Sequence, residues 1–308
     1  MLNNETIAAI ATPPGTGGIG VVRVSGKKTR IIAKHIIDGL PPKRTAVIRT
    51  FVNGAGEALD SGLAVYFQGP NSYTGEDVLE LQGHGGPGVL RLILRACIDA
   101  GARLAEPGEF TKRAYLNSKL DLAQAESVAD LIGASSEAAV LSAHRSLSGE
   151  FSTRTEQIKT ELIEARVFVE AAIDFSEEEI DFLKDESVKD RLNGVHLSLV
   201  QLREQATQGN LLREGAKVVL AGEPNVGKST LMNRLSEEET SIVTQYAGTT
   251  RDSIERQIIV GGMPMLIIDT AGLRRSDDPI ESMGIQRTLD HLKDADVIVD
   301  IREAGSDL

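Results

Sequence analysis

The sequence predicts a multidomain α/β protein in which a mixed α/β region, an all-helical region and a phosphate-binding α/β region follow one another. Three observations support this prediction. Short β-branched segments separated by turn residues fill the first region, apolar residues recur at helical spacing in the second, and a glycine-rich loop follows an apolar segment in the third. We therefore expect domains at residues 1–118, 119–214 and 215–308.

The composition is that of a folded protein. Hydrophobic residues make up 41% and charged residues 25% of the 308 positions, as in ordinary globular domains. Cys97 is the only cysteine, which excludes a disulfide framework and favours a small buried side chain. The single cysteine favours a reducing cytoplasm. No apolar run reaches the ~18 residues of a membrane helix, so we expect no membrane contact. The net charge of −12 disfavours a general nucleic-acid coat.

The first domain is expected to contain β-strands and two helices. The strands are predicted at 6–11, 19–24, 46–52, 63–67 and 78–81, and the helices at 28–37 and 89–100, with Gly101 ending the second helix. His84 lies in a glycine-rich turn, where packing and ligand contact are equally compatible with the sequence, so it receives no role.

The second domain is expected to consist of several long antiparallel helices. Apolar residues recur at helical spacing over 120–132, 158–173 and 188–212. Acids outnumber bases between residues 150 and 190, which we interpret as a solvated helix face with an acidic loop at 176–181.

The third domain begins with a phosphate-binding motif. Residues 222–229 read G-E-P-N-V-G-K-S and match G-x-x-x-x-G-K-[ST], with an apolar strand expected before it and a helix after it. In such a loop, backbone N–H groups and the helix N-terminus surround a polyphosphate. Lys228 would contact the β- and γ-phosphates, and the Ser229 hydroxyl can ligate Mg²⁺.

Two further segments follow at GTPase spacing. Thr249 and Thr250 lie in the segment G-T-T-R-D, and D-T-A-G begins at Asp269 after an apolar strand. A loop threonine can close on Mg²⁺ and the γ-phosphate, and an aspartate at a strand end can hold the Mg²⁺ shell. The three motifs predict a P-loop GTPase, whose nucleotide we expect on Gly222, Asn225, Val226, Gly227, Lys228, Ser229, Thr230, Thr244, Thr249, Thr250, Asp269, Thr270, Ala271 and Gly272.

Two features bear on hydrolysis. Leu273 stands where many GTPases place a glutamine that orients water, so another group must act on the water or hydrolysis is slow. Asn225, Thr244 and Thr249 offer neutral oxygens that could hold a monovalent cation, although for Asn225 a loop-shaping role is equally compatible.

The motifs together resemble one family. G-E-P-N-V-G-K-S-T, I-V-T-Q-Y-A-G-T-T-R-D and I-I-D-T-A-G-L-R are similar to segments of the tRNA modification GTPases MnmE (TrmE). So are A-T-P-P-G-T-G-G-I-G-V-V-R-V-S-G, S-Y-T-G-E-D-V-L-E-L-Q-G-H-G-G, P-G-E-F-T-K-R-A-Y-L-N-S-K-L-D-L-A-Q-A-E and L-L-R-E-G in the first two regions. The resemblance spans essentially the whole chain.

The resemblance implies an enzyme that hydrolyses GTP and modifies tRNA. With the FAD-dependent partner MnmG (GidA), in a heterotetramer, it would form 5-carboxymethylaminomethyl or aminomethyl groups at C5 of the wobble uridine. A 5,10-methylene- or 5-formyl-tetrahydrofolate would supply the carbon, and glycine or ammonium the amine. The first domain would form a homodimer, and the GTPase domain would be inserted into the helical domain.

The resemblance also implies site residues. Arg23, Glu80 and Lys119 would bind the folate, and Gly15–Gly20 would be a loop that shapes the folate pocket or the dimer contact. Glu281 would act on the water in place of the missing glutamine. The metal ligands would be Ser229 and Thr250 for Mg²⁺, and Asn225, Thr244, the Tyr246 backbone and Thr249 for K⁺.

The sequence contains no N-K-x-D motif, which reads guanine in GTPases, and the last expected strand lies at 297–301. We therefore expect an incomplete GTPase domain. Two alternatives remain open. One is a GTP-gated binding switch, such as a ribosome-assembly GTPase. The other is an inactive fragment that only dimerises and binds folate.

Overall fold

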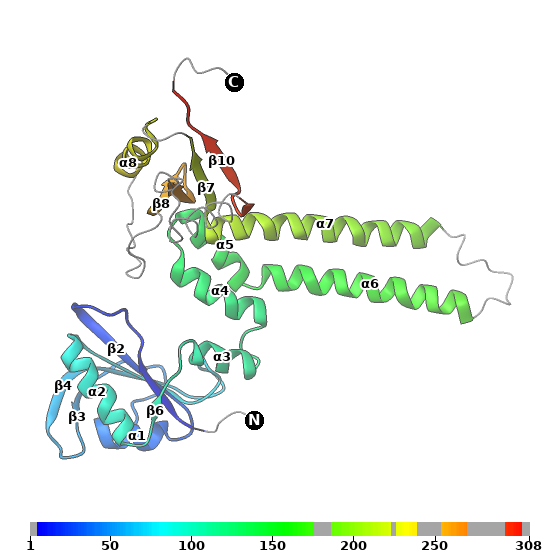
Figure 1. Ribbon diagram of the computed structural model, residues 1–308. Coiled ribbons are helices and arrows are strands. Elements are labelled where there is room, and N and C mark those ends of the chain that lie inside the picture. The colour runs from blue at the N-terminus through cyan, green and yellow to red at the C-terminus, as the bar shows by residue number, and fades with distance from the viewer. Residues whose placement is uncertain (1–4, 175–185, 223–225, 239–253, 270–292, 304–308) are drawn as a thin grey trace, which may run out of the picture. The chain divides into compact units, whose positions relative to one another are not determined.

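The computed structural model describes residues 5–174, 186–222, 226–238, 254–269 and 293–303 (Figure 1). Its contacts divide the chain into two compact units, residues 1–125 and 126–308. The expected division into three domains stays a prediction. Within the described ranges, no helix combines the length and apolar character needed to cross a bilayer.

The first unit is built on a six-stranded sheet with the order β3-β4-β5-β2-β1-β6. The pairings among β1 to β5 are antiparallel, and the short β6 runs parallel to β1. The strands are β1 (Ile7–Ile10), β2 (Gly17–Ser25), β3 (Val47–Val52), β4 (Ala58–Phe67), β5 (Val78–Gly85) and β6 (Arg103–Leu104). All five strands predicted in this region are therefore present, with β2, β4 and β5 longer than expected.

The interpretation of Gly15–Gly20 as a loop is wrong for Gly17–Gly20, which opens β2. Gly17 pairs with Gly85, and Gly20 pairs with Gly83 of β5. A Cβ on Gly85 would lie 2.6 Å from the Gly17 carbonyl oxygen, so these backbones meet only because side chains are absent. The glycines permit β2 and β5 to pair closely. The sequence around Gly17–Gly20 alone could not indicate this, because β5 lies far along the chain.

Two helices cover one face of this sheet and enclose the core. These are α1 (Thr29–Ile37) and α2 (Pro87–Asp99), and their buried side chains pack against Val22, Leu79 and Leu81. Cys97 on α2 is fully buried in this core, which confirms its expected character. Helix α2 ends at Asp99 with Ala100 as its C-cap, one residue before the predicted Gly101. Gly101 follows the cap with a φ of 106°, and hydrogen bonds run from its own N–H to Ile98 and from Ala102 to Cys97.

The opposite face of the sheet carries the charged residues Arg23 and Glu80 among its side chains. Arg23 lies between the buried Val22 and Val24 on β2, so its side chain points away from the core. The strand register pairs Arg23 with Glu80 of β5. Helix α3 (Glu109–Leu116), which we did not predict, places side chains beside this pair.

The second unit contains the predicted helical region. Its helices are α4 (Leu122–Gly133, which begins in the first unit), α5 (Glu137–Leu147), α6 (Glu150–Asp174) and α7 (Glu186–Glu214). Arg154 of α6 donates to Gln201 of α7, and Glu164 of α6 pairs with Arg191 of α7, so the two long helices are antiparallel, as expected (Figure 1). The acidic loop at 176–181 lies outside the described residues.

The second unit also holds a four-stranded sheet with the order β10-β7-β9-β8. Strand β7 is parallel to β9 and β10, whereas β8 is antiparallel to β9. Gly261 and Gly262, both with positive φ, form the tight turn from β8 to β9. The elements are β7 (Ala216–Ala221), α8 (Lys228–Glu238), β8 (Ile254–Val260), β9 (Met263–Asp269) and β10 (Val297–Asp300).

Candidate functional site

The phosphate loop leaves β7 at Gly222, where the chain passes very close to a neighbouring strand segment. Gly222 has a φ of 140°, and a Cβ there would lie 2.2 Å from the Ile301 carbonyl oxygen. The Ile301 N–H donates to the Ala221 carbonyl at 2.8 Å, which holds the two segments together. Only glycine fits this position, because both the backbone angle and the available space exclude a side chain.

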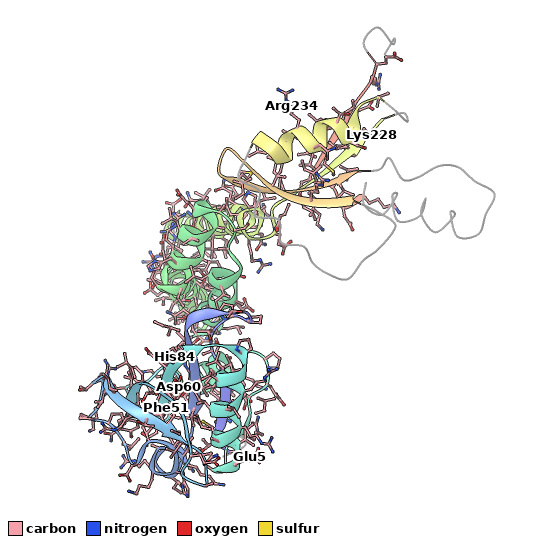
Figure 2. All side chains as sticks on the ribbon, turned by 90° about the vertical axis from the view of Figure 1, so that its left-hand side faces the viewer. Glu5, Phe51, Asp60, His84, Lys228 and Arg234 are labelled. Atoms are coloured by element: carbon pink, nitrogen blue, oxygen red, sulfur yellow. The ribbon has the colours of Figure 1, made fainter. Side chains whose placement is uncertain are left out.

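Lys228 stands at the first position of α8, where the loop enters the helix (Figure 2). Its side chain is buried, and Nζ donates to the Gly222 carbonyl oxygen at 2.8 Å, across the loop. Ser229 and Thr230 follow in the same helical turn and are exposed. The ammonium group, the helix N-terminus and a hydroxyl therefore gather at one point, an arrangement suited to a bound anion.

Asp269 lies at the same edge of the sheet. It pairs in register with Leu220, two residues before Gly222. Because β7 and β9 are parallel, their carboxyl ends meet at this edge, as the motif order predicts. Val226 and Gly227 complete the described part of the loop, and the Ser229 hydroxyl is of the oxygen-donor type that Mg²⁺ accepts.

The remaining residues predicted for the nucleotide and metal sites lie outside the described residues. They are Asn225, Thr244, Tyr246, Thr249, Thr250, Thr270, Ala271, Gly272 and Glu281. Among the described residues, no three His, Cys, Asp or Glu side chains form a metal-binding group.

A second candidate site lies in the first unit, around the ion pair of Arg23 and Glu80. Arg23 Nε and Nη2 both approach Glu80 Oε1, at 2.9 and 2.8 Å. The Glu80 side chain is 17% exposed and that of Arg23 28% exposed. Because both contacts use Oε1, the second carboxylate oxygen can accept from a ligand, and the rest of the guanidinium can donate to one.

Two aromatic side chains flank this pair, and sequence reasoning missed both. The Arg23 guanidinium lies over the rings of Tyr73, at 5.4 Å, and Phe110, at 5.6 Å from the ring centroid. Both aromatics fall inside the family-like segments S-Y-T-G-E-D and P-G-E-F-T-K-R, in a chain with only 4% aromatic residues. The position of each aromatic residue within a polar motif was the sequence signal that could have identified it as part of the site.

Lys119, the third predicted folate residue, follows α3. A Cβ on Gly75 would lie 3.3 Å from Lys119 Cγ, so the lysine stem packs against the loop that carries Tyr73. The structure thus pairs Arg23 directly with Glu80, and it places Lys119 against the adjoining loop.

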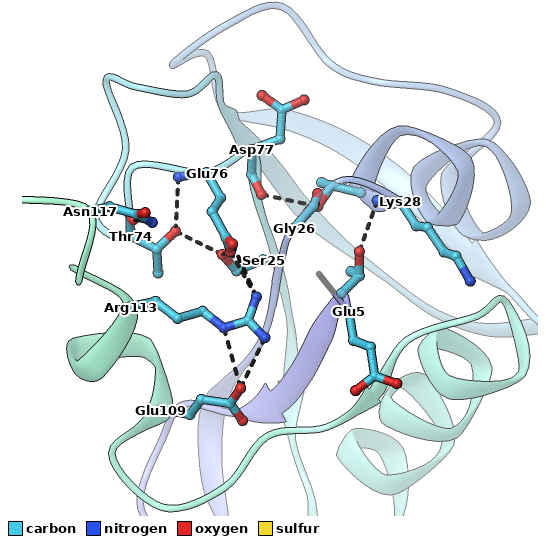
Figure 3. Close-up of polar contacts among 12 residues, drawn as sticks. Glu5, Ser25, Gly26, Lys28, Thr74, Glu76, Asp77, Glu109, Arg113 and Asn117 are labelled. Carbon is cyan, nitrogen blue, oxygen red and sulfur yellow. Dashed lines mark hydrogen bonds and ion pairs between the residues drawn. The ribbon is translucent and has the colours of Figure 1, made fainter. Parts of the chain in front are cut away.

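An ionic network centred on the buried Arg113 and Glu109 supports this region (Figure 3). Arg113 of α3 donates to Glu76 at 3.0 and 3.1 Å and to Glu109 at 2.9 Å. Arg103 donates to both oxygens of Glu109, at 2.9 and 2.7 Å. The hydrogen bonds from Arg103, the Glu106 N–H and Arg113 together hold the pKa of Glu109 at about 2.

His84, which received no role, lies on β5 rather than in a turn, and its exposed side chain pairs with the largely buried Asp60 (Figure 2). Its Nδ1 lies 2.7 Å from Asp60 Oδ1, and its backbone N–H donates to Oδ2 of the same carboxylate. Burial acts to raise the pKa of Asp60, but hydrogen bonds from His84 and the Ser61 N–H outweigh it, and the pKa lies below its usual value. Asp60 thereby fixes the orientation of an exposed imidazole.

A strand, a phosphate loop and a helix, with an aspartate ending the adjacent parallel strand, define a P-loop nucleotide-binding protein. The chain matches the family model for the GTP-binding protein TrmE N-terminus over residues 6–119, and the MnmE helical domain over residues 122–305. It belongs to the MnmE family of tRNA modification GTPases.

Curated relatives agree with this assignment. The chain is 56% identical over 302 residues to the tRNA modification GTPase MnmE of Chromobacterium violaceum, covering 97% of this chain and 67% of that protein. It is 54% identical to MnmE of Nitrosomonas europaea, with 97% and 66% covered, and 55% identical to MnmE of Coxiella burnetii, with 96% and 65% covered. The chain spans about two thirds of the length of these relatives.

Proposed function

We propose that this protein is a GTP-hydrolysing enzyme of tRNA modification. Together with FAD-dependent MnmG in a heterotetramer, it would form 5-carboxymethylaminomethyl or aminomethyl groups at C5 of wobble uridine, with a tetrahydrofolate as carbon donor. The observation that supports GTP as a ligand is the placement of Lys228 and Asp269 at one edge of the β7–β9 sheet. The matched relatives are each named tRNA modification GTPase, which supports the coupling to tRNA.

The nucleotide site would work through backbone amides and a few side chains. Lys228 would exchange its bond to the Gly222 carbonyl for the β- and γ-phosphates. Ser229 and Thr250 would hold Mg²⁺, and Asn225, Thr244, the Tyr246 backbone and Thr249 would hold K⁺. Glu281 would act on the attacking water as a base or through a bridging water.

The folate site would use the Arg23–Glu80 pair and Lys119. The second Glu80 oxygen would accept from the N–H edge of a pterin, and the two cationic side chains would meet carbonyl or carboxylate groups of the ligand. The first domain would also form the homodimer. With a net charge of −12, a local basic surface or the partner would contribute most of the attraction to tRNA in the cytoplasm.

Titration of a fluorescent GTP analogue tests the nucleotide assignment. Lys228→Ala should weaken binding by roughly tenfold or more, because it removes a charge-assisted contact. Lys189→Ala, an exposed lysine on α7, is the matched control and should bind as the unmodified chain does. Equal affinity in both variants would show that the loop does not bind the phosphates.

Titration of 5-formyl-tetrahydrofolate tests the second site and separates the alternatives. Arg23→Ala and Glu80→Gln should each weaken binding by roughly tenfold, whereas Arg95→Ala on the exposed side of α2 should not. Nucleotide binding without folate binding would favour a GTP-gated binding switch, such as a ribosome-assembly GTPase. Folate binding without nucleotide binding would favour an inactive fragment.

A further inference from the structure

Helix α3 is fastened at three points to the loop of residues 73–76. The Tyr73 hydroxyl and Thr111 Oγ1 are 2.8 Å apart, Asn117 Nδ2 donates to the Thr74 carbonyl at 2.7 Å, and Arg113 pairs with Glu76. The same helix and loop provide Phe110 and Tyr73 beside the Arg23 guanidinium. The position of the two rings therefore depends on how firmly helix and loop hold each other.

Arg113 is the centre of this attachment. It is 3% exposed and bonds two carboxylates on different elements, Glu109 one turn earlier on α3 and Glu76 on the loop (Figure 3). Ser25 Oγ donates to Glu76 Oε2 at 2.7 Å, and Ser25 lies two residues beyond Arg23 on β2. One guanidinium thus connects the helix, the loop and the strand from which the candidate site is built.

The chemistry of the pair explains why an arginine occupies this position. Buried ion pairs give little net stability compared with apolar packing of the same volume, because both charges lose their hydration. The planar guanidinium does fix geometry, since its fork meets carboxylates at defined angles that an ammonium does not impose. Such a network therefore fixes the position of α3 precisely, although it adds little net stability.

We propose that Arg113 is a positioning residue of the folate site, and that the Tyr73 and Phe110 rings it holds in place are the aromatic walls of that site. The ligand class that these walls accept is a flat conjugated heterocycle, with N–H donors for Glu80 and carbonyl or carboxylate groups for Arg23. The inference rests on the proposed function, because it assigns geometry to the same Arg23–Glu80 site.

The absence of tryptophan from the chain allows a sharp test. Phe110→Trp introduces a single indole at the wall, and the full 308-residue protein carrying it is titrated with 5-formyl-tetrahydrofolate. Its indole emission should change on ligand addition. Adding Arg113→Lys should weaken folate binding by roughly tenfold and move the ligand-free emission to longer wavelength, as the ring becomes more exposed to water. Affinity for the GTP analogue should not change.

Two further variants keep the test decisive. Glu76→Gln is milder, since Arg113 retains Glu109, and it should produce a smaller change in the same direction. Arg95→Lys, an exposed conservative change on α2, should leave affinity and emission unaltered. The positioning role would be overturned if neither Arg113→Lys nor Glu76→Gln changed the ligand-free emission or the folate affinity. Failure of the Phe110→Trp and unmodified proteins to bind folate would instead overturn the proposed function, and with it the assignment of the walls.

Discussion

At the scale of single residues, the Glu109 carboxylate links pH to the stability of the first unit. Its pKa is held at about 2, below the ordinary 4.5, first by Arg103 and further by the Glu106 N–H and Arg113. A lowered pKa means that the carboxylate contributes its full stabilisation above about pH 4.5, and that this contribution is lost as the pH falls toward 2.

We therefore expect the free energy of unfolding to fall steeply between roughly pH 5 and pH 2.5. Urea unfolding of the Phe110→Trp protein, followed by indole emission, measures it. Glu109→Gln should be less stable at neutral pH by about 1–3 kcal/mol, because Arg103 and Arg113 lose the charged acceptor that they share while keeping Glu5 and Glu76, and its stability should depend less on pH. Glu57→Gln, an exposed control on the β3–β4 turn, should retain the steep dependence. Parallel curves for the Glu109 and Glu57 variants would show that Glu109 does not cause the pH dependence.

Gly222 gives a second prediction at this scale. Gly222→Ala must accommodate both a positive φ and a Cβ only 2.2 Å from the Ile301 carbonyl, so β7 and the segment after β10 must separate. Gly227→Ala is the matched control, because its φ is 104° but a Cβ at that position would have no atom of the described residues within 4 Å. Thermal unfolding should show Gly222→Ala as the less stable variant by about 1–3 kcal/mol. Equal stability would mean that backbone angle alone, and not the close approach, requires glycine.

At the scale of elements, sequence patterns predicted the helices and strands whose buried apolar residues recur at regular spacing. They missed elements that lack this spacing. The strands of the first unit and the helices around Leu192 and Ile158 were predictable because apolar side chains recur at the period of the element. Helix α3 was missed because its buried residues are Glu109, Arg113 and Ala114, so charge occupies the face that hydrophobic periodicity would reveal. Strand β8 was also missed, although the Gly261–Gly262 turn was a readable hairpin signal.

Helix α5 offers a prediction at the element scale. Ser136 precedes it in extended conformation, and its side-chain oxygen accepts from the Ala139 N–H at 3.1 Å. Ser136→Ala should destabilise the start of the helix by about 1 kcal/mol, whereas Ser136→Thr should retain most of the cap. Hydrogen exchange of the first-turn amides, followed by mass spectrometry, measures the difference. Unchanged protection in the alanine variant would show that packing of Ala139 and Ala143 alone fixes this end.

At the scale of the whole molecule, the two candidate sites differ in how much sequence could predict. The phosphate loop is contiguous and acts through its backbone, so motif order alone identified its class, and the register of β7 with β9 then placed Asp269 beside it. Arg23 and Glu80 lie 57 residues apart and meet only through the β2–β5 pairing. No local pattern encodes that contact. The family resemblance named the two residues as folate ligands, and the strand register showed that they pair with each other.

The last prediction concerns catalysis by the proposed GTPase as an assembly. If neutral oxygens at Asn225 and Thr249 hold a monovalent ion and the active form is a dimer, the hydrolysis rate per molecule should rise with protein concentration in KCl. In NaCl of equal ionic strength it should stay low, because the smaller Na⁺ ion does not match a site of K⁺ size. Asn225→Ala should abolish the difference between the salts while GTP binding persists, and Lys228→Ala should abolish hydrolysis in both. Equal rates in the two salts at every concentration would exclude the cation site, and would leave Asn225 with a loop-shaping role.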